Sequence, residues 1–101
     1  MGLPVVEKAV VINSPHGLHM RPAELLAQLA QSFESEIKVI RESLCVDAKS
    51  IIQVMTLGAR QGTELTLRAH GSDAAEALEA IAHLVASDFE TDETMSQESS
   101  R

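Results

Sequence analysis

The 101-residue sequence predicts an α+β fold in which a four-stranded antiparallel sheet carries three helices on one face. Four short runs that are β-branched, or that alternate polar and apolar residues, indicate strands. Three longer or capped segments repeat apolar residues at helical spacing, and clusters of Gly, Pro, Ser and Asn separate them. The order along the chain is strand, helix, strand, strand, helix, strand, helix, which is typical of an antiparallel sheet with its helices on one side.

The predicted strands are short and differ in pattern. VVEKAVVI is β-branched over most of its length, whereas EIKVIR and TELTLRA alternate polar and apolar residues. A tight polar turn joins EIKVIR to SLCVDA, so these two runs are expected to form a hairpin. Cys45 lies in the second strand of this hairpin, where we expect a small buried apolar residue. The strands are expected at residues 5–12, 36–41, 43–48 and 63–69.

The predicted helices have recognisable start signals. Ser50 and Gln53 have the spacing of a capping box at the start of the short middle helix. Asp73 and Glu76 have the same spacing at the start of the last helix, where we expect a second capping box. The helices are expected at residues 20–33, between 50 and 58, and at residues 74–89.

The composition indicates one small acidic domain. Eight Lys and Arg against fifteen Asp and Glu give a net charge of -7, which argues against nucleic acid, and no Trp or Tyr is present to stack on bases. A single cysteine cannot form an internal disulfide, and the N-terminus lacks the pattern of a secretory signal, so we expect a cytoplasmic protein. No apolar run approaches the roughly 20 residues that span a bilayer. We therefore expect a monomer with neither a membrane nor a nucleic acid as partner.

The start of the first helix concentrates unusual chemistry for so acidic a chain. In the stretch SPHGLHMRPAELL, His19 directly precedes the helix, whose first backbone N–H groups have no partner within the helix. Those N–H groups and the helix dipole attract anions and favour the neutral form of an imidazole beside them. Because a neutral ring keeps a lone pair that can attack phosphorus, His19 is a candidate nucleophile that would become a phosphohistidine.

Three neighbouring residues fit that role. Gly17 can adopt the backbone angles that turn the strand into the helix, and Pro22 is tolerated in a first turn, where its missing N–H costs little. Arg21 can fold back and offer a planar cation to phosphate oxygens. The pattern alone has low specificity, since His19 could equally be a polar loop residue and Arg21 a solvated charge. His16 precedes the helix N–H groups, and we assign it no direct role.

The remaining histidines do not suggest a metal centre. His70 is expected in a surface turn and His83 at the solvent edge of the last helix. No pair among the four histidines and the cysteine has the spacing of a known metal site. We therefore expect no metal and no other cofactor.

The string GLHMRPAELL resembles the active-site motif of the HPr family, the histidine-containing phosphocarrier proteins of the bacterial phosphoenolpyruvate-dependent sugar phosphotransferase system, whose pattern runs Gly-Leu-His-Ala-Arg-Pro-Ala. The segment AKSIIQVMTLGARQGTELTLRAHGSDAAEAL is similar to the part of that family that carries a regulatory serine. Two motifs in register over about residues 6–85 are more specific than either alone. The resemblance implies an open-faced β-sandwich, with a phosphocarrier domain over residues 1–90. The acidic polar tail over residues 91–101 is an addition to the family pattern, and because it has almost no apolar residues we expect it to be disordered.

The resemblance also implies roles for individual residues. His19 would accept a phosphoryl group on Nδ1 from phosphorylated enzyme I, which draws it from phosphoenolpyruvate, and would donate it to an A-type domain of a sugar permease or regulatory branch. Arg21 would hold and release the group. Ser50 matches a serine that a dedicated kinase modifies in some members, although helix capping alone also explains this residue. The family's exposed docking patch corresponds to Ile51, Ile52 and Met55, which Met20 could extend.

The sequence departs from the family pattern at several positions. Met20 replaces a commoner alanine, and Gln53 stands where many members have glycine. Asp47 and Glu42 add negative charge near Ser50, which weakens the expected recognition by a kinase. None of these changes removes the nucleophile or its arginine.

Two other classes of function stay open at this point. The chain could be a regulatory binding module controlled through Ser50 and the adjacent apolar patch, without phosphoryl transfer. It could also be a small hydrolase, although the sequence offers no second acid or base positioned beside His19. The presence of Arg21 favours the carrier.

Overall fold

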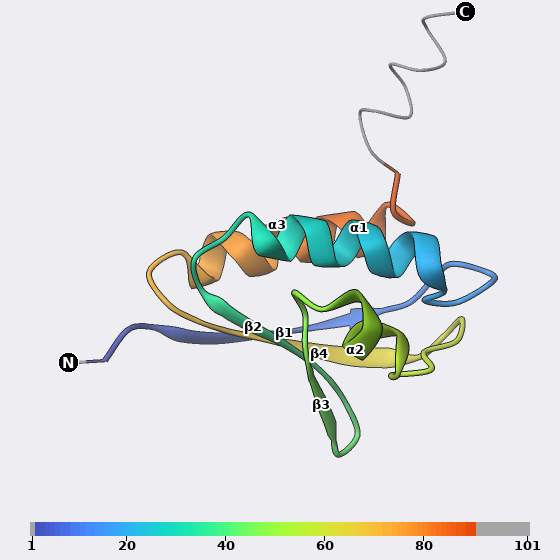
Figure 1. Cartoon of the computed structure of the whole chain (residues 1–101), viewed down its shortest axis with the longest axis horizontal. Coiled ribbons are helices and arrows are strands. Elements are labelled where there is room, and N and C mark those ends of the chain that lie inside the picture. Colours follow the sequence, from blue (N-terminus) through green and yellow to red (C-terminus); the bar gives the residue numbers. More distant parts are fainter. Residues whose placement is uncertain (1, 91–101) are drawn as a thin grey trace, which may run out of the picture.

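The computed structural model describes residues 2–90, which form one antiparallel sheet and three helices. The strand order is β1-β4-β2-β3, and all three neighbouring pairs are antiparallel. The helices lie on one side of the sheet and leave its other face uncovered, which confirms the predicted fold class (Figure 1). The elements are β1 (Val5–Val11), α1 (Met20–Gln31), β2 (Glu36–Arg41), β3 (Leu44–Asp47), α2 (Ile51–Met55), β4 (Glu64–His70) and α3 (Ala74–Ala86).

The elements follow the predicted order, and the long helices end earlier than predicted. Helix α3 ends at Ala86 because Asp88 and Phe89 adopt left-handed backbone angles, with φ of 59° and 63°. The Phe89 N–H donates to the Leu84 carbonyl oxygen at 2.8 Å, which completes the turn that stops the helix. The tail predicted for residues 91–101 lies outside the described residues. None of the described helices has the length and apolar character to cross a membrane.

The core lies between the sheet and helices α1 and α3. Alternate residues of β4, among them Leu65 and Leu67, are fully buried and face the helices. Leu26 of α1 and Ile81 of α3 are equally buried from the opposite side. Burial of each such side chain stabilises the fold by about 1.5–3 kcal/mol. The apolar pattern of each strand and helix therefore determines which of its faces packs into the core.

Cys45 is exposed, so the prediction of a buried cysteine is wrong. Its neighbour Val46 is 4% exposed and faces the helices. Because side chains alternate along a strand, Cys45 points to the uncovered face of the sheet, beside its register partner Ile40. His70 was also misplaced by the prediction, since it is the last residue of β4 rather than part of a turn.

Asp73 ties the start of α3 to the loop that follows α1. It occupies the N-cap position of α3, but its carboxylate makes no cap hydrogen bond, so the predicted capping box with Glu76 is wrong. The carboxylate instead accepts hydrogen bonds from the backbone N–H groups of Glu34, at 2.9 Å, and Ser35, at 3.0 Å, and from the Ser35 hydroxyl. Gly71 permits this approach, because a Cβ at that position would lie 2.7 Å from the Ser35 Cα.

We expect Asp73→Asn to lower the melting temperature at pH 7 by several degrees. Hydrogen bonds from the Ser35 side chain and the Glu34 backbone hold the pKa of Asp73 below its ordinary value of 3.8. A carboxyl group whose pKa is lowered by folding stabilises the folded chain above its unfolded pKa, and this contribution is lost as the pH falls through the folded pKa. Thermal unfolding between pH 7 and pH 2 should therefore show the two melting curves converging below pH 3.8.

The exposed Glu79→Gln variant is the control, because it removes one carboxylate without touching the loop after α1. A constant difference between Asp73→Asn and the unchanged chain over the whole pH range would contradict the assignment.

Candidate functional site

A tight turn leads from β1 toward α1. The Gly17 N–H donates to the Ser14 carbonyl oxygen at 2.9 Å, which closes a turn with Pro15 and His16 at its two central positions. Ser14 is only 7% exposed, and the proline ring restricts its own φ. The turn is therefore anchored at its base, and His16 stands at its exposed corner.

Gly17 packs directly against the loop that follows α2. Its φ of 72° lies in the left-handed region, which confirms the unusual backbone angle predicted for it. A Cβ at this position would lie 2.5 Å from the Ala59 carbonyl oxygen, closer than any side chain can approach. The same oxygen accepts a hydrogen bond from the Leu18 N–H at 2.9 Å. Glycine is thus required here both for its backbone conformation and for the close contact.

His19 is the N-cap residue of α1, and its side chain is exposed. Its backbone is extended and its carbonyl oxygen accepts the Ala23 N–H at 3.0 Å, while its imidazole makes no cap hydrogen bond. Within residues 2–90 the backbone N–H groups of Met20 and Arg21 find no backbone acceptor, and Pro22 has no N–H to satisfy. The exposed imidazole of His19 therefore lies beside two free backbone donors and the positive end of a twelve-residue helix.

Arg21 lies on the first turn of α1 and pairs with Glu24. Its Nη1 is 3.2 Å from Glu24 Oε1, and the two side chains are 61% and 39% exposed. Exposed pairs at this spacing on a helix contribute only about 0.2–0.5 kcal/mol, so little holds the guanidinium in this position. The cation can move to an anion beside His19 at small cost.

His16, for which the sequence predicted no direct role, lies next to His19 in the structure. Its ring lies edge-on to that of His19, with ring centroids 5.9 Å apart and ring planes at 83°. The signal in the sequence was the three-residue spacing of the two histidines across Gly17, whose left-handed backbone connects the turn to the helix. No third His, Cys, Asp or Glu of the described residues joins the two rings in a metal-binding group.

Ser50 caps α2 as predicted. Its hydroxyl accepts the Gln53 N–H at 3.2 Å. The reciprocal half of the predicted capping box is wrong, because Gln53 Oε1 accepts the Asp47 N–H at 3.0 Å instead of the Ser50 N–H. The Asp47 carbonyl oxygen in turn accepts the Ser50 N–H at 3.1 Å, so residues 47–50 form a hydrogen-bonded turn directly before α2.

The residues expected to form a docking patch differ in exposure. Ile52 is 75% exposed, Met20 62% and Met55 38%. Ile51 is half-buried and packs against the core, on the same side of α2 as the buried Val54. Three of the four side chains are therefore available to a partner, and Ile51 mainly supports α2.

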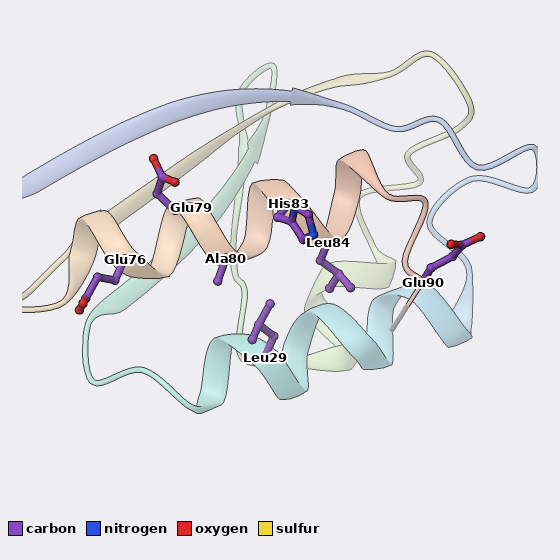
Figure 2. Close-up of a pocket in the computed structure, with 7 residues that line it drawn as sticks. All are labelled: Leu29, Glu76, Glu79, Ala80, His83, Leu84 and Glu90. Carbon is purple, nitrogen blue, oxygen red and sulfur yellow. The ribbon is translucent and has the colours of Figure 1, made fainter. Parts of the chain in front are cut away.

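A separate hollow of about 660 Å³ lies between α1 and α3, and Figure 2 shows the side chains that line it. Leu29 of α1 points toward Ala80 and Leu84 of α3, and these residues form an apolar floor (Figure 2). The lining also includes the carboxylates of Glu76 and Glu79. None of the predicted site residues lines this hollow, and its carboxylates repel a phosphorylated ligand.

Comparison with known proteins identifies relatives over most of the chain. A protein-family model described as "PTS HPr component phosphorylation site" matches residues 6–87. The phosphocarrier protein HPr of Treponema pallidum is 42% identical over 86 residues, which cover 85% of this chain and 98% of the relative. The phosphocarrier protein HPr of Buchnera aphidicola is 44% identical over 73 residues, covering 72% of this chain and 86% of the relative.

A solved structure supports the same assignment. HPr-C-His from Thermoanaerobacter tengcongensis superposes with a TM-score of 0.80 at 42% sequence identity, covering 83% of this chain and 94% of that one. The sheet order, the three helices and the exposed histidine at the start of α1 therefore occur in a chain whose sequence and fold both match one family. This chain belongs to the HPr family of phosphocarrier proteins of the phosphotransferase system.

Proposed function

We propose that His19 accepts a phosphoryl group from phosphorylated enzyme I, which draws it from phosphoenolpyruvate, and passes it to an A-type domain of a sugar permease or regulatory branch. The observation that carries this proposal is the exposed imidazole of His19 beside the unpaired N–H groups of Met20 and Arg21. An anion on the ring can take hydrogen bonds from these N–H groups and attraction from the helix dipole without any rearrangement of the backbone.

The transfer is a displacement at phosphorus. The Nδ1 lone pair of neutral His19 attacks as the nitrogen–phosphorus bond of the donor histidine breaks, and the donor nitrogen keeps the bonding electron pair. One proton passes through the solvent from the acceptor ring to the donor ring, so charge and atoms balance. Arg21 leaves Glu24 and neutralises part of the charge on the phosphoryl oxygens.

The exposure of the site favours a carrier over a hydrolase acting alone. His19 and Met20 both lie at the surface, so another protein can bring its own reactive histidine within reach of the ring. A hydrolase also needs a base that positions water, and neither Arg21 nor the backbone donors can take a proton. The ring of His16, 5.9 Å from that of His19, is the neighbouring group that could, and the phosphate-release measurement below tests this alternative. The exposed apolar side chains of Met20, Ile52 and Met55 offer contact area to the proteins that give and receive the phosphoryl group.

We also propose Ser50 as a regulatory phosphorylation site for a serine kinase. Its hydroxyl is half-buried and already accepts the Gln53 N–H, a bond that a phosphate oxygen can take over. Phosphorylation would add about -1.5 to -2 charge units close to Ile52, enough to change which partners bind there. No contact among the described residues favours a purely regulatory module over the carrier.

The experiment that tests the carrier is incubation of the full chain with enzyme I and phosphoenolpyruvate, followed by addition of an A-type domain. We expect one acid-labile phosphoryl group per chain, seen by mass and by phosphorus NMR as a phosphohistidine, and its disappearance as the A-type domain becomes phosphorylated. Release of free phosphate without an acceptor domain, at the rate seen with one, would identify a hydrolase and overturn the proposal.

A further inference from the structure

We propose that His16 is a second phosphoryl-binding residue, which donates a hydrogen bond to an oxygen of the phosphoryl group on His19 and holds that group more strongly in acid. This inference rests on the proposed function, because it requires a phosphohistidine at His19.

Hydrogen bonds to its neighbours hold the backbone of the turn that carries His16. The Gly17 N–H closes the turn on Ser14 at 2.9 Å, and the Leu18 N–H is bound to Ala59. The side chain of Gln61 donates to the Asn13 carbonyl oxygen at 3.1 Å on the opposite side. The backbone that carries His16 is therefore braced, and its exposed ring lies beside that of His19.

The distance between the two rings fits a bridging oxygen. The centroids are 5.9 Å apart and the planes are nearly perpendicular, at 83°. A hydrogen bond from a ring N–H to an oxygen spans about 2.7–3.2 Å, so a phosphoryl oxygen attached to one ring can lie within reach of a nitrogen on the other. Both rings are exposed, so no protein group has to move out of this space.

The charges near the turn favour a second cation that would bind the phosphoryl group on His19. Arg21 shares its charge with Glu24 at 3.2 Å, and the chain as a whole carries a net charge of -7. Arg60 is the charged residue of the loop against which Gly17 packs. Glu90, which follows α3, lines the separate hollow between α1 and α3 (Figure 2). Glu24 therefore neutralises part of the charge of Arg21, the arginine next to His19, where a doubly charged phosphoryl group must be held.

Histidine supplies a cation that depends on pH. It is the ordinary side chain whose charge changes between pH 5 and 8, whereas arginine stays charged throughout. A neutral His16 can donate one hydrogen bond, and a protonated one donates a charge-assisted bond that is roughly twice as strong. The balance between holding the phosphoryl group and passing it on should therefore shift toward holding as the solution becomes more acidic.

The test compares the full chain with His16→Phe, which keeps an aromatic ring but has no N–H, and with His16→Asn, which keeps a neutral donor. The equilibrium constant for phosphoryl exchange with enzyme I is measured from pH 8.5 to pH 5.5 by mass spectrometry. We expect the ratio of this constant between the unchanged chain and His16→Phe to rise about tenfold toward acid. The ratio of His16→Asn to His16→Phe should exceed one and stay constant, because an amide does not titrate.

The outcomes separate this inference from the carrier proposal. Equal exchange constants for all three chains at every pH, with phosphate on His19 in each, would overturn the role of His16 and leave the carrier intact. Phosphate found on His16 itself would also overturn it. No phosphorylation of any of the three chains would refute the proposed function, and the role of His16 with it. Melting temperatures of the unphosphorylated chains show whether the variants fold alike.

Discussion

The His19→Ala chain is expected to take up no phosphoryl group from phosphorylated enzyme I. The substitution removes the ring nitrogen that forms the bond to phosphorus, and the N–H groups of Met20 and Arg21 cannot replace a nucleophile. Because the His19 imidazole makes no cap hydrogen bond, its loss costs the helix no cap, and the variant should fold with an unchanged melting temperature. Mass spectrometry after incubation with enzyme I and phosphoenolpyruvate measures the incorporation.

His83→Ala is the matched control, since it removes an exposed histidine from α3 and leaves the start of α1 untouched. It should be phosphorylated at the rate of the unchanged chain. Full incorporation into His19→Ala would show that another residue is the acceptor, and proteolytic mapping of the phosphate would then identify it.

Arg21→Ala should accept a phosphoryl group but pass it on about 100-fold more slowly, the loss typical of removing one positioned electrostatic contact at a reacting group. The pair between Arg21 and Glu24 is exposed and weak, so the variant loses little stability from breaking it. The large effect falls on the transition state, where the phosphoryl group leaves one nitrogen for another and the guanidinium neutralises its oxygens. Rapid mixing of the phosphorylated variant with an A-type domain measures the rate.

Arg68→Ala provides the comparison for charge, because it also removes one arginine but from a surface pair with Glu7 at 2.7 Å on the sheet. Its transfer rate should equal that of the unchanged chain. If both variants slowed transfer equally, the effect would come from net charge and not from the position of Arg21.

Much of the fold could be predicted from the sequence because its signals are local. The alternation in TELTLRA and the helical spacing in the two long helices depend only on which face of each element is covered, and they gave the correct order of elements. The cap of α2 by Ser50 is also local, since donor and acceptor are three residues apart. The fold class followed from these signals with no knowledge of tertiary contacts.

The errors come from contacts between distant parts of the chain. Asp73 and Glu76 have the spacing of a capping box, yet the Asp73 carboxylate does not cap the helix. It accepts three hydrogen bonds from Glu34 and Ser35 instead, which together replace the single bond of a cap. Cys45 is small and apolar enough for a core, but its position in the alternation points it to the uncovered face. Neither outcome can be seen in a window of a few residues.

The candidate site divides in the same way. His19 and Arg21 are found at the start of α1 where the motif predicts them, because a helix start is a local event. The proximity of His16 to His19 depends on the left-handed backbone at Gly17, which in turn is held by Ala59. The proximity of the His16 ring to His19 could therefore not be predicted from the sequence.

The contact between Gly17 and Ala59 limits how the site can be transplanted. The carbonyl oxygen of Ala59 lies against Gly17 and accepts the Leu18 N–H, so the backbone before His19 is supported by a segment about forty positions further along the chain. A peptide or a foreign scaffold that carried only GLHMRPA would lack this brace, and its histidine would sample many orientations. Protein engineers who wish to build a phosphoryl relay from this family must move both segments together.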